Sequence, residues 1–224
     1  METTQNQPFK VTTSFPKNFY EKSAWADQGY IIGIDEVGRG CSAGPVVAAA
    51  AMLHPNAKHK LLQDSKMLTQ DELKTAYTWI IQHSWYGIGI VSHTHIDTHN
   101  IYKATQCAMT RALAQLKATA GHTPKTIVVD AMPINQQSFQ AETLYFIKGE
   151  SKSTSIAAAS IIAKVTRDRL MKEMSASFPA YNLCQHKGYT TAEHQKALND
   201  YGPSLIHRLT FIPTLDAHEQ QTFF

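Results

Sequence analysis

Five short segments rich in apolar and β-branched residues constrain the fold of this 224-residue chain more than any other feature. Each is followed by glycine, proline or polar residues, a pattern that is typical of buried β-strands in a globular domain. We therefore predict β-strands at residues 30–37, 46–53, 85–91, 126–131 and 143–149.

Helical patterns fill most of the sequence between and after these strands. Thr69 and Glu72 have the spacing of a capping box, and so do Thr190 and Glu193. We predict helices over residues 69–84, 100–120, 155–174 and 190–199. Early strands followed by alternating helices and strands predict an α/β domain with a mixed sheet.

The predicted elements gather into one main domain. Residues 1–28 read as a polar lead-in with a short helix around 19–26, and the main domain covers 29–202. Residues 203–224 are predicted to form an irregular C-terminal tail.

Composition narrows the class of protein. No apolar run is long enough to span a bilayer, and the N-terminus lacks the layout of a signal peptide, so we expect a cytoplasmic protein with no membrane partner. The three cysteines are too scattered for a disulfide framework or a zinc knuckle. The net charge of +3 is only a mild indication of a polyanionic partner.

Carboxylates follow three of the predicted strands. Asp35 and Glu36 end the first, Asp130 ends the fourth, and Glu150 follows the fifth. Ligand sites in open α/β sheets gather at strand ends, and oxygen-rich clusters suit Mg²⁺ or Mn²⁺. Each acid alone is better explained as a cap of a helix or turn, but that explanation is weaker for all of them together.

Asp35 and Glu36 are adjacent, which limits how they can share a site. Successive side chains of a regular strand point to opposite faces, so we expect the strand to end or distort here. The Gly38-Arg39-Gly40 turn directly follows the pair. Its glycines allow the backbone to approach a ligand closely, whereas an ordinary connector between strands is the alternative.

Six segments of the sequence resemble the ribonuclease HII family. They occur in that family's order and spread over about residues 30 to 212. The segments are IDEVGRG (34–40), DSKML (64–68), IDTHNI (96–101), VVDAM (128–132), IAAASIIAKVTRDR (156–169) and HKGYTTAEH (186–194).

The resemblance implies a ribonuclease H-like fold, with a central mixed five-stranded sheet flanked by helices and a small helical C-terminal extension. It implies an endonuclease that cleaves RNA in RNA/DNA hybrids and cuts on the 5′ side of single ribonucleotides in duplex DNA. Such cleavage leaves 3′-hydroxyl and 5′-phosphate ends and serves ribonucleotide removal in DNA repair and replication. We expect a monomer that uses two Mg²⁺ or Mn²⁺ ions.

The metal-binding carboxylates carry over by position. Asp35, Glu36 and Asp130 match the family's pattern, whereas Glu150 stands where the family usually has aspartate. A glutamate keeps the charge but reaches one methylene further. We therefore expect Glu150 to serve as the fourth catalytic carboxylate, with reduced activity or a preference for Mn²⁺.

Two features are implied to read the ribonucleotide. The backbone of Gly38, Arg39 and Gly40 would meet the 2′-hydroxyl, the group that separates RNA from DNA. The ring of Tyr189 would stack on the sugar of the next deoxynucleotide. Without the HKGY context, Tyr189 is better explained as a partly buried aromatic residue before a helix.

Four further residues are candidates for phosphate contacts, partly by the resemblance: Lys66, Asn100, Ser160 and Lys164. Ser160 and Lys164 lie four residues apart and hence on one helical face, which Asp168 shares. The alternative pairs Lys164 with Asp168 and leaves Ser160 as a small packing residue.

Two other patterns have weaker interpretations. His93, His95 and His99 lack the carboxylate or cysteine spacing that would complete a zinc site, so we expect them in a solvated loop with Asp97 as a helix cap. Phe223 and Phe224 resemble the short peptides by which bacterial replication proteins dock on the sliding clamp. A frayed or folded-back tail is the favoured alternative.

Two other functions stay open at this point. Another ribonuclease H-like nuclease, such as a resolvase or integrase, would share the carboxylates but not the GRG and HKGY segments. A non-catalytic hybrid-binding protein would keep those segments and have lost activity through Glu150. Dependence of cleavage on the 2′-hydroxyl distinguishes all three.

Overall fold

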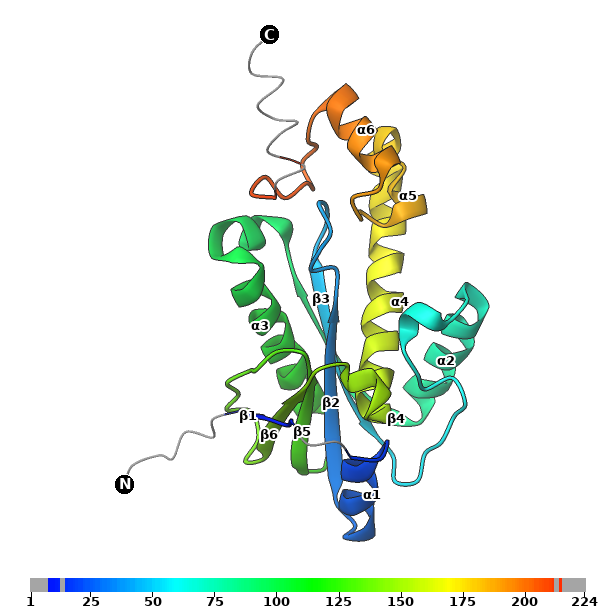
Figure 1. The fold of residues 1–224 in the computed structure, drawn as a ribbon, viewed down its shortest axis with the longest axis vertical. Helices are drawn as coiled ribbons and strands as arrows, with labels where there is room; N and C mark the ends of the chain where they lie inside the picture. Colours follow the sequence, from blue (N-terminus) through cyan, green and yellow to red (C-terminus); the bar gives the residue numbers. More distant parts are fainter. Residues whose placement is uncertain (1–7, 13–14, 212–213, 215–224) are drawn as a thin grey trace, which may run out of the picture.

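The computed structural model describes residues 8–12, 15–211 and 214. Its sheet has six strands in the order β1-β6-β5-β2-β3-β4 (Figure 1). The strands are β1 (Phe9–Lys10), β2 (Tyr30–Val37), β3 (Val46–Leu53), β4 (Ser84–Val91), β5 (Pro124–Asp130) and β6 (Glu142–Phe146). Neighbours from β1 to β2 are parallel, whereas β3 is antiparallel to both β2 and β4. The predicted mixed sheet is confirmed, with β1 from the lead-in added as a sixth strand.

Helices cover both faces of the sheet. In Figure 1, α3 lies on one side, and α2 and α4 lie on the other. The α-helices are α1 (Phe19–Ala26), α2 (Gln70–Gln82), α3 (His93–Thr119), α4 (Thr154–Ser177), α5 (Leu183–His186) and α6 (Ala192–Tyr201). The short 3₁₀ helices are η1 (Ser65–Met67), η2 (Gly149–Ser151) and η3 (Pro179–Tyr181). Within the described ranges, no helix is long and apolar enough to cross a membrane.

The two-residue period of β3 divides the core into two layers. Val46, Ala48, Ala50 and Met52 belong to the cluster that includes buried residues of α3. The intervening residues belong to the cluster that includes α2 and α4: Val47, Ala49, Ala51 and Leu53. Side chains of a strand alternate between faces, so this fully buried strand serves both layers.

A glycine in β2 lets α4 approach the sheet. A Cβ added at Gly33 would lie 2.1 Å from the backbone carbon of Ser155, which is far closer than atoms can approach. The helix backbone therefore lies directly over β2. This contact aligns the first turns of α4 with the strand that carries Asp35 and Glu36.

The start of α4 is held by α1 and by its own cap. Ser153 Oγ accepts a hydrogen bond from the Ile156 amide at 3.1 Å, and Glu21 Oε1 accepts one from the Ser155 amide at 3.1 Å. Asn18 Oδ1 accepts from the Thr154 amide at 2.9 Å. The first amides of α4 are thus satisfied, and the acidic Glu21 also suits the positive end of the helix dipole.

Helix α3 begins at His93, and the loop predicted for His93, His95 and His99 is wrong. Ser92 is the N-cap, because its side chain accepts from the His95 amide. The rings of His95 and His99 stack with 4.2 Å between their centroids. The helix is interrupted at Asn100, whose positive φ of 68° is not helical, so two helical segments meet at the predicted start.

Asp97 does not cap the helix. It instead accepts hydrogen bonds from the amides of Leu209 and Thr210, at 2.9 and 3.0 Å. The acid therefore ties the start of α3 to the C-terminal segment. This long-range contact explains why a local capping pattern was misleading.

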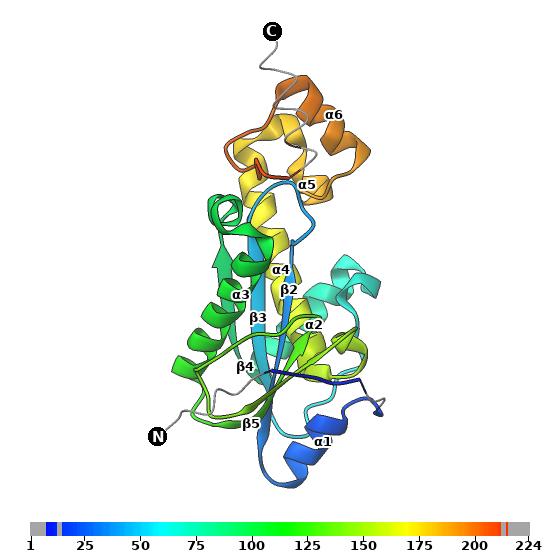
Figure 2. The same cartoon turned by 60° about the vertical axis from the view of Figure 1, so that its left-hand side comes forward.

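The C-terminal elements form a small layer at the far end of α4 (Figure 2). The cap of α6 is Thr191 rather than Thr190, since Thr191 Oγ1 accepts from the His194 amide at 3.2 Å. Thr190 Oγ1 lies 2.5 Å from Ser42 Oγ. Residues 203–211 contain no helix or strand, yet the Arg208 amide donates to the Ser42 carbonyl at 2.8 Å. Phe223 and Phe224 lie outside the described residues.

Candidate active site

A cavity of about 430 Å³ collects most of the predicted site residues. It lies where β2 and β5 end, between η1, η2 and α4. Its lining consists of Asp35, Glu36, Val37, Ser65, Lys66, Asp130, Glu150, Ser160, Lys164 and Tyr189. Residues far apart in the sequence are thus brought together, including all four candidate carboxylates.

Parallel pairing explains why the carboxylates meet. β2 and β5 are neighbours and run parallel, so Asp35 and Asp130 leave the same edge of the sheet. β6 is parallel to β5, and the chain after it turns into η2, which carries Glu150. The Gly149 amide donates to Asp130 Oδ1 at 2.6 Å, which ties Asp130 to the short helix that carries Glu150.

At Asp35 and Glu36, strand β2 has lost one of its two neighbouring strands. Pairing of β2 with β5 stops at Ile34, whereas pairing with β3 continues through Asp35 and Glu36 to Val37. The expected distortion is therefore a one-sided loss of the ladder. Both side chains line the cavity, and Asp35 Oδ1 accepts from the Glu36 amide at 2.7 Å.

Burial and mutual repulsion dominate the electrostatics of the acids. Burial, followed by the charges of Glu36 and Asp130, raises the pKa of Asp35 well above its ordinary value. Burial also raises the pKa of Asp130 to about 7, and the neighbouring Glu150 adds to that shift. Without a cation, the cluster therefore holds its negative charge at a free-energy cost.

The donor set fits a divalent cation. All four side chains offer oxygen, and two buried oxygens, Glu36 Oε2 and Glu150 Oε2, have no hydrogen-bond partner among the described residues. Nevertheless, among the residues that the structure describes, no three acidic, histidine or cysteine side chains are already drawn around one point. Charge and donor chemistry favour a metal, and rotation of the side chains would have to complete its coordination.

The Gly38-Arg39-Gly40 turn lies beside this cavity and does not line it. Gly38 has a φ of +93°, and an added Cβ would lie 2.2 Å from Arg167 Nε. A Cβ at Gly40 would instead meet no protein atom within 4 Å. Arg39 Nη1 donates to Glu36 Oε1 at 3.3 Å. Packing therefore requires a glycine at 38, and it leaves open space at 40.

Two fully buried arginines hold the chain from the turn to Pro45, and both were missed by sequence reasoning. Arg208 donates to the carbonyls of Gly38, Arg39 and Gly44, at 2.7, 2.9 and 3.0 Å. Arg167 donates to three other carbonyls, those of Ala43, Pro45 and Lys187. The only signal was their position within the polar strings TRDR and HR, which does not by itself indicate burial.

Tyr189 is the lining residue from the C-terminal layer. It forms an isolated antiparallel bridge with Cys41, just after the glycine turn, and 39% of its surface is exposed. The Arg167 guanidinium lies 5.9 Å from its ring centroid. The backbone of Tyr189 is thus held by the bridge to Cys41, and the residue lines the cavity.

The phosphate candidates divide into two groups. Lys66, Ser160 and Lys164 line the cavity, whereas Asn100 does not and its Oδ1 accepts from the Lys103 amide at 3.0 Å. Lys164 Nζ also donates to Asp168 at 2.8 Å, and Ser160 Oγ lies 3.0 Å from Ser65 Oγ. Lys164 and Ser160 therefore make the structural contacts of the alternative interpretation and also line the cavity. Lys66 is exposed at the cavity.

A chain of hydrogen-bonded histidines lies behind Tyr189. His207 Nδ1 accepts from the Ser204 amide at 2.9 Å, which places the His207 proton on Nε2. His207 Nε2 therefore donates to His194 Nε2, with 2.9 Å between the two nitrogens, and His194 Nδ1 donates to the Tyr189 carbonyl at 3.0 Å. Both imidazole rings must be neutral for this chain to form. A second proton on His207 would face the Ser204 amide, and a second proton on His194 would face the Nε2 proton of His207.

Acid should therefore loosen the C-terminal layer. Burial, then the nearby His194, lowers the pKa of His207 from 6.5 to about 4, so the unfolded chain takes up this proton first as the pH falls. The stabilisation is complete above pH 6.5 and is lost towards pH 4. From pH 7.5 to pH 5, we expect wild type to lose about 2 kcal/mol more unfolding free energy in urea than His207→Gln. Equal losses would contradict the hydrogen-bonded scheme.

Solved structures share this architecture. Ribonuclease H2 from Pyrococcus horikoshii OT3 superposes with a TM-score of 0.72 and 24% identity, covering 85% of this chain and 98% of that one. The Mn²⁺ complex of Bst-RNase HIII gives a TM-score of 0.66 and 20% identity, covering 96% and 76%. The fold is thus that of the ribonuclease H-like α/β proteins, with an acidic cavity at the strand ends.

Sequence comparison narrows this class to one family. The Ribonuclease HII family model matches residues 32–214. Ribonuclease HII from Pseudothermotoga lettingae is 41% identical over 196 residues, which is 88% of this chain and 83% of that protein. The chain belongs to the ribonuclease HII family. It is a metal-dependent ribonuclease H, an endonuclease that hydrolyses phosphodiester bonds in RNA/DNA hybrids.

Proposed function

We propose that this enzyme also cuts duplex DNA on the 5′ side of a single embedded ribonucleotide and so starts its removal during DNA repair and replication. The products would be a 3′-hydroxyl and a 5′-phosphate. One observation carries the proposal: the four carboxylates and Tyr189 line the same cavity, with the Gly38-Arg39-Gly40 turn at its margin. Cutting groups and groups that can read the sugar are thus within reach of one nucleotide.

Asp35, Glu36, Asp130 and Glu150 are the proposed ligands of two Mg²⁺ or Mn²⁺ ions. When bound, divalent cations activate water and stabilise the leaving oxygen of an in-line displacement. The carboxylates need no proton for this task, and Glu36 is further held by Arg39. Lys66 and Lys164 supply positive charge at the cavity wall, where a phosphate would enter.

Selectivity is proposed to come from backbone shape and from a ring. The carbonyls of Gly38 and Arg39 are oriented by Arg208, so the turn presents a fixed backbone surface towards the 2′-hydroxyl. Open space at Gly40 lets a sugar approach closely. Tyr189 would contact the following deoxynucleotide, where an extra hydroxyl would crowd its ring.

Removal of the Tyr189 ring tests this selectivity. Tyr189→Ala should reduce cleavage at a single ribonucleotide by about tenfold or more, relative to cleavage of a continuous hybrid, because a stacked ring contributes about 1–3 kcal/mol. Tyr189→Phe keeps the ring and should keep the preference. An equal drop on both substrates would contradict a role in selectivity, and thermal melting would show whether the Ala variant is folded.

Shortening Glu150 tests the fourth carboxylate. Glu150 Oε2 is buried without a partner, and its carboxylate lies beside Asp130, so its reach decides how an ion is held. We expect Glu150→Asp to raise the Mg²⁺-supported rate by several-fold and to weaken any preference for Mn²⁺. Steady-state rates in each metal measure this, and an unchanged rate and metal preference would rule out the proposed effect of the longer side chain.

Docking on a sliding clamp through Phe223 and Phe224 stays a prediction, because both residues lie outside the described structure. Deletion of the two residues should abolish clamp binding if they are the docking peptide. Unchanged binding would exclude them.

A further inference from the structure

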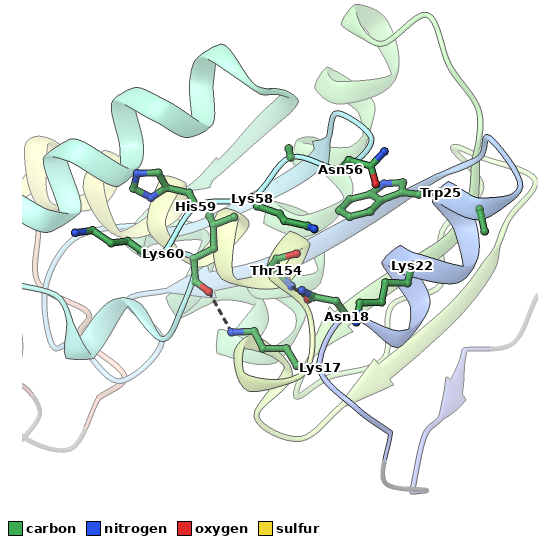
Figure 3. A pocket seen from close by; sticks show the side chains of 12 residues that line it. Lys17, Asn18, Lys22, Trp25, Asn56, Lys58, His59, Lys60 and Thr154 are labelled. Carbon is green, nitrogen blue, oxygen red and sulfur yellow. Dashed lines mark hydrogen bonds between the residues drawn. The ribbon is translucent and has the colours of Figure 1, made fainter.

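A second cavity, of about 710 Å³, lies near the catalytic one and has a basic lining (Figure 3). It is formed by α1, the loop over residues 56–62 and the first residue of α4. Among the described residues, no acidic side chain lines it. The lining residues are Lys17, Asn18, Lys22, Trp25, Ala26, Asn56, Ala57, Lys58, His59, Lys60, Leu62 and Thr154.

Most of the lysines that line this pocket are not neutralised by an ion pair within the described structure. Lys17 Nζ donates to the Leu62 carbonyl at 3.1 Å, which fixes one ammonium group at the wall. Lys22, Lys58 and Lys60 are exposed and take part in none of the ion pairs found among the described residues. Four lysines around one concavity, with no compensating acid in the lining, create a strongly positive potential.

A buried hydroxyl at the pocket also lacks a partner. Thr154 is 9% exposed and lines the cavity, and its Oγ1 makes no hydrogen bond within the described structure. The neighbouring amides of α4 are already bound by Asn18 and Glu21. Attraction of an anion therefore depends on the lysines, and the free hydroxyl adds a polar group that a ligand would satisfy.

The pocket also has groups that suit a nucleobase. Trp25 is half-buried, with one part packed against the core and another at the cavity, and Figure 3 shows Lys58 extending towards it. Asn18 and Asn56 add side-chain amides to the lining. Aromatic rings with lysines along one groove are how proteins hold single-stranded nucleic acid, since bases stack and phosphates pair with the charges.

The chain connects this pocket directly to the catalytic cavity. Thr154 and Ser160 both belong to α4, and six residues of helix span about 9 Å. Leu62 lines the basic pocket, and Ser65 and Lys66, three and four residues later, line the catalytic one. The distance matches one or two nucleotides of extended strand. A short unpaired extension of a strand held at the carboxylates would therefore be long enough to reach the pocket.

We propose that this pocket binds an unpaired nucleotide of a strand that continues beyond the duplex held at the catalytic cavity. The inference rests on the proposed function, since the duplex places the tail. A concave pocket with an aromatic wall favours an unpaired nucleotide, because the bases of a paired flank are stacked and cannot enter. The volume is also in the range of sites that enclose one small ligand.

Binding of tailed duplexes tests the inference. Fluorescence anisotropy in EDTA, which prevents cleavage, would compare a blunt duplex containing one ribonucleotide with the same duplex carrying an unpaired DNA or RNA tail at either end. We expect at least one tail to tighten binding about tenfold. The tail should also steepen the dependence of log K on log salt by about 1.4, for two phosphates at about 0.7 each.

Two variants assign the effect to the pocket. Lys22→Gln/Lys58→Gln should remove most of the tail's gain, measured as the ratio of tailed to blunt affinity. Lys10→Gln/Lys117→Gln loses the same charge from exposed positions outside the pocket lining and should retain that ratio. A tail effect on DNA and RNA alike identifies the shared backbone and base chemistry as the ligand.

The outcomes separate the two proposals. Equal affinity of wild type for blunt and tailed duplexes overturns the pocket assignment, and so does a tail gain that survives in Lys22→Gln/Lys58→Gln. Competition by inorganic phosphate for the tail, with no effect of the tail's bases, would reduce the pocket to a small-anion site and also overturn it. Failure to cut the blunt duplex at its ribonucleotide once Mg²⁺ or Mn²⁺ is added would instead contradict the proposed function itself.

Discussion

Replacement of Asp35 by asparagine is expected to abolish cleavage and, at the same time, to stabilise the metal-free protein. Asp35 is buried among like charges, and its pKa is raised mainly by burial and then by Glu36 and Asp130. The amide removes one charge from this cluster, and its oxygen can still accept from the Glu36 amide. We expect the unfolding free energy in EDTA to rise by about 1 kcal/mol.

The same substitution should cost activity heavily. A metal-bound site supplies several kcal/mol of transition-state stabilisation, so loss of a ligand should lower the Mg²⁺-supported rate by about a thousandfold or more. Asp200→Asn is a suitable control, because Asp200 forms an exposed ion pair with Lys196. It should leave the rate unchanged and the stability within about 0.5 kcal/mol. A stable Asp35→Asn enzyme that cuts at the wild-type rate would contradict the assignment.

Loss of Arg208 is expected to have the largest effect on the protein's stability. This side chain is fully buried and donates to three carbonyls of the segment that follows β2. Burial lowers its pKa to about 10, so it is still charged at neutral pH. Arg208→Ala would remove all three of these hydrogen bonds, although the Gly38 carbonyl keeps a 3.4 Å bond from the Cys41 amide, at a cost of about 3–5 kcal/mol.

Arg208→Lys and Arg111→Ala sharpen that experiment. A lysine keeps the charge but cannot reach three carbonyls at once, so it should recover only part of the stability. Arg111 is exposed and donates to the single carbonyl of Ile90, so its removal should cost less than about 1 kcal/mol. Urea unfolding at neutral pH measures all three. A cost for Arg208→Ala as small as that for Arg111→Ala would show that the turn is held by other contacts.

Much of the fold could be predicted because the signals were local. Strand β3 is apolar throughout and is buried on both faces, and the Thr69–Glu72 capping box starts α2 with both of its hydrogen bonds. The convergence of the acids was also predictable, since parallel strands deliver their ends to one edge. The resemblance added the identity of the substrate, which periodicity cannot supply.

Features that depend on distant contacts could not be predicted. β1 is only two residues long, and its pairing with β6 joins segments more than 130 residues apart. Asp97 looks like a helix cap until the C-terminal segment is placed against it. Arg167 and Arg208 are fully buried because backbone carbonyls gather around them, and neither has a sequence pattern that marks it as buried.

We propose that the acidic cavity and the adjacent turn together choose and cut one ribonucleotide. The most direct test maps the cut in a DNA duplex that contains a single ribonucleotide, with Mg²⁺ or Mn²⁺, beside an all-DNA duplex and a continuous hybrid. We expect one cut on the 5′ side of the ribonucleotide, with a 3′-hydroxyl end, and no cutting of the all-DNA duplex. Equal cutting of the all-DNA duplex, or binding of the ribonucleotide duplex without cleavage in either metal, would contradict it.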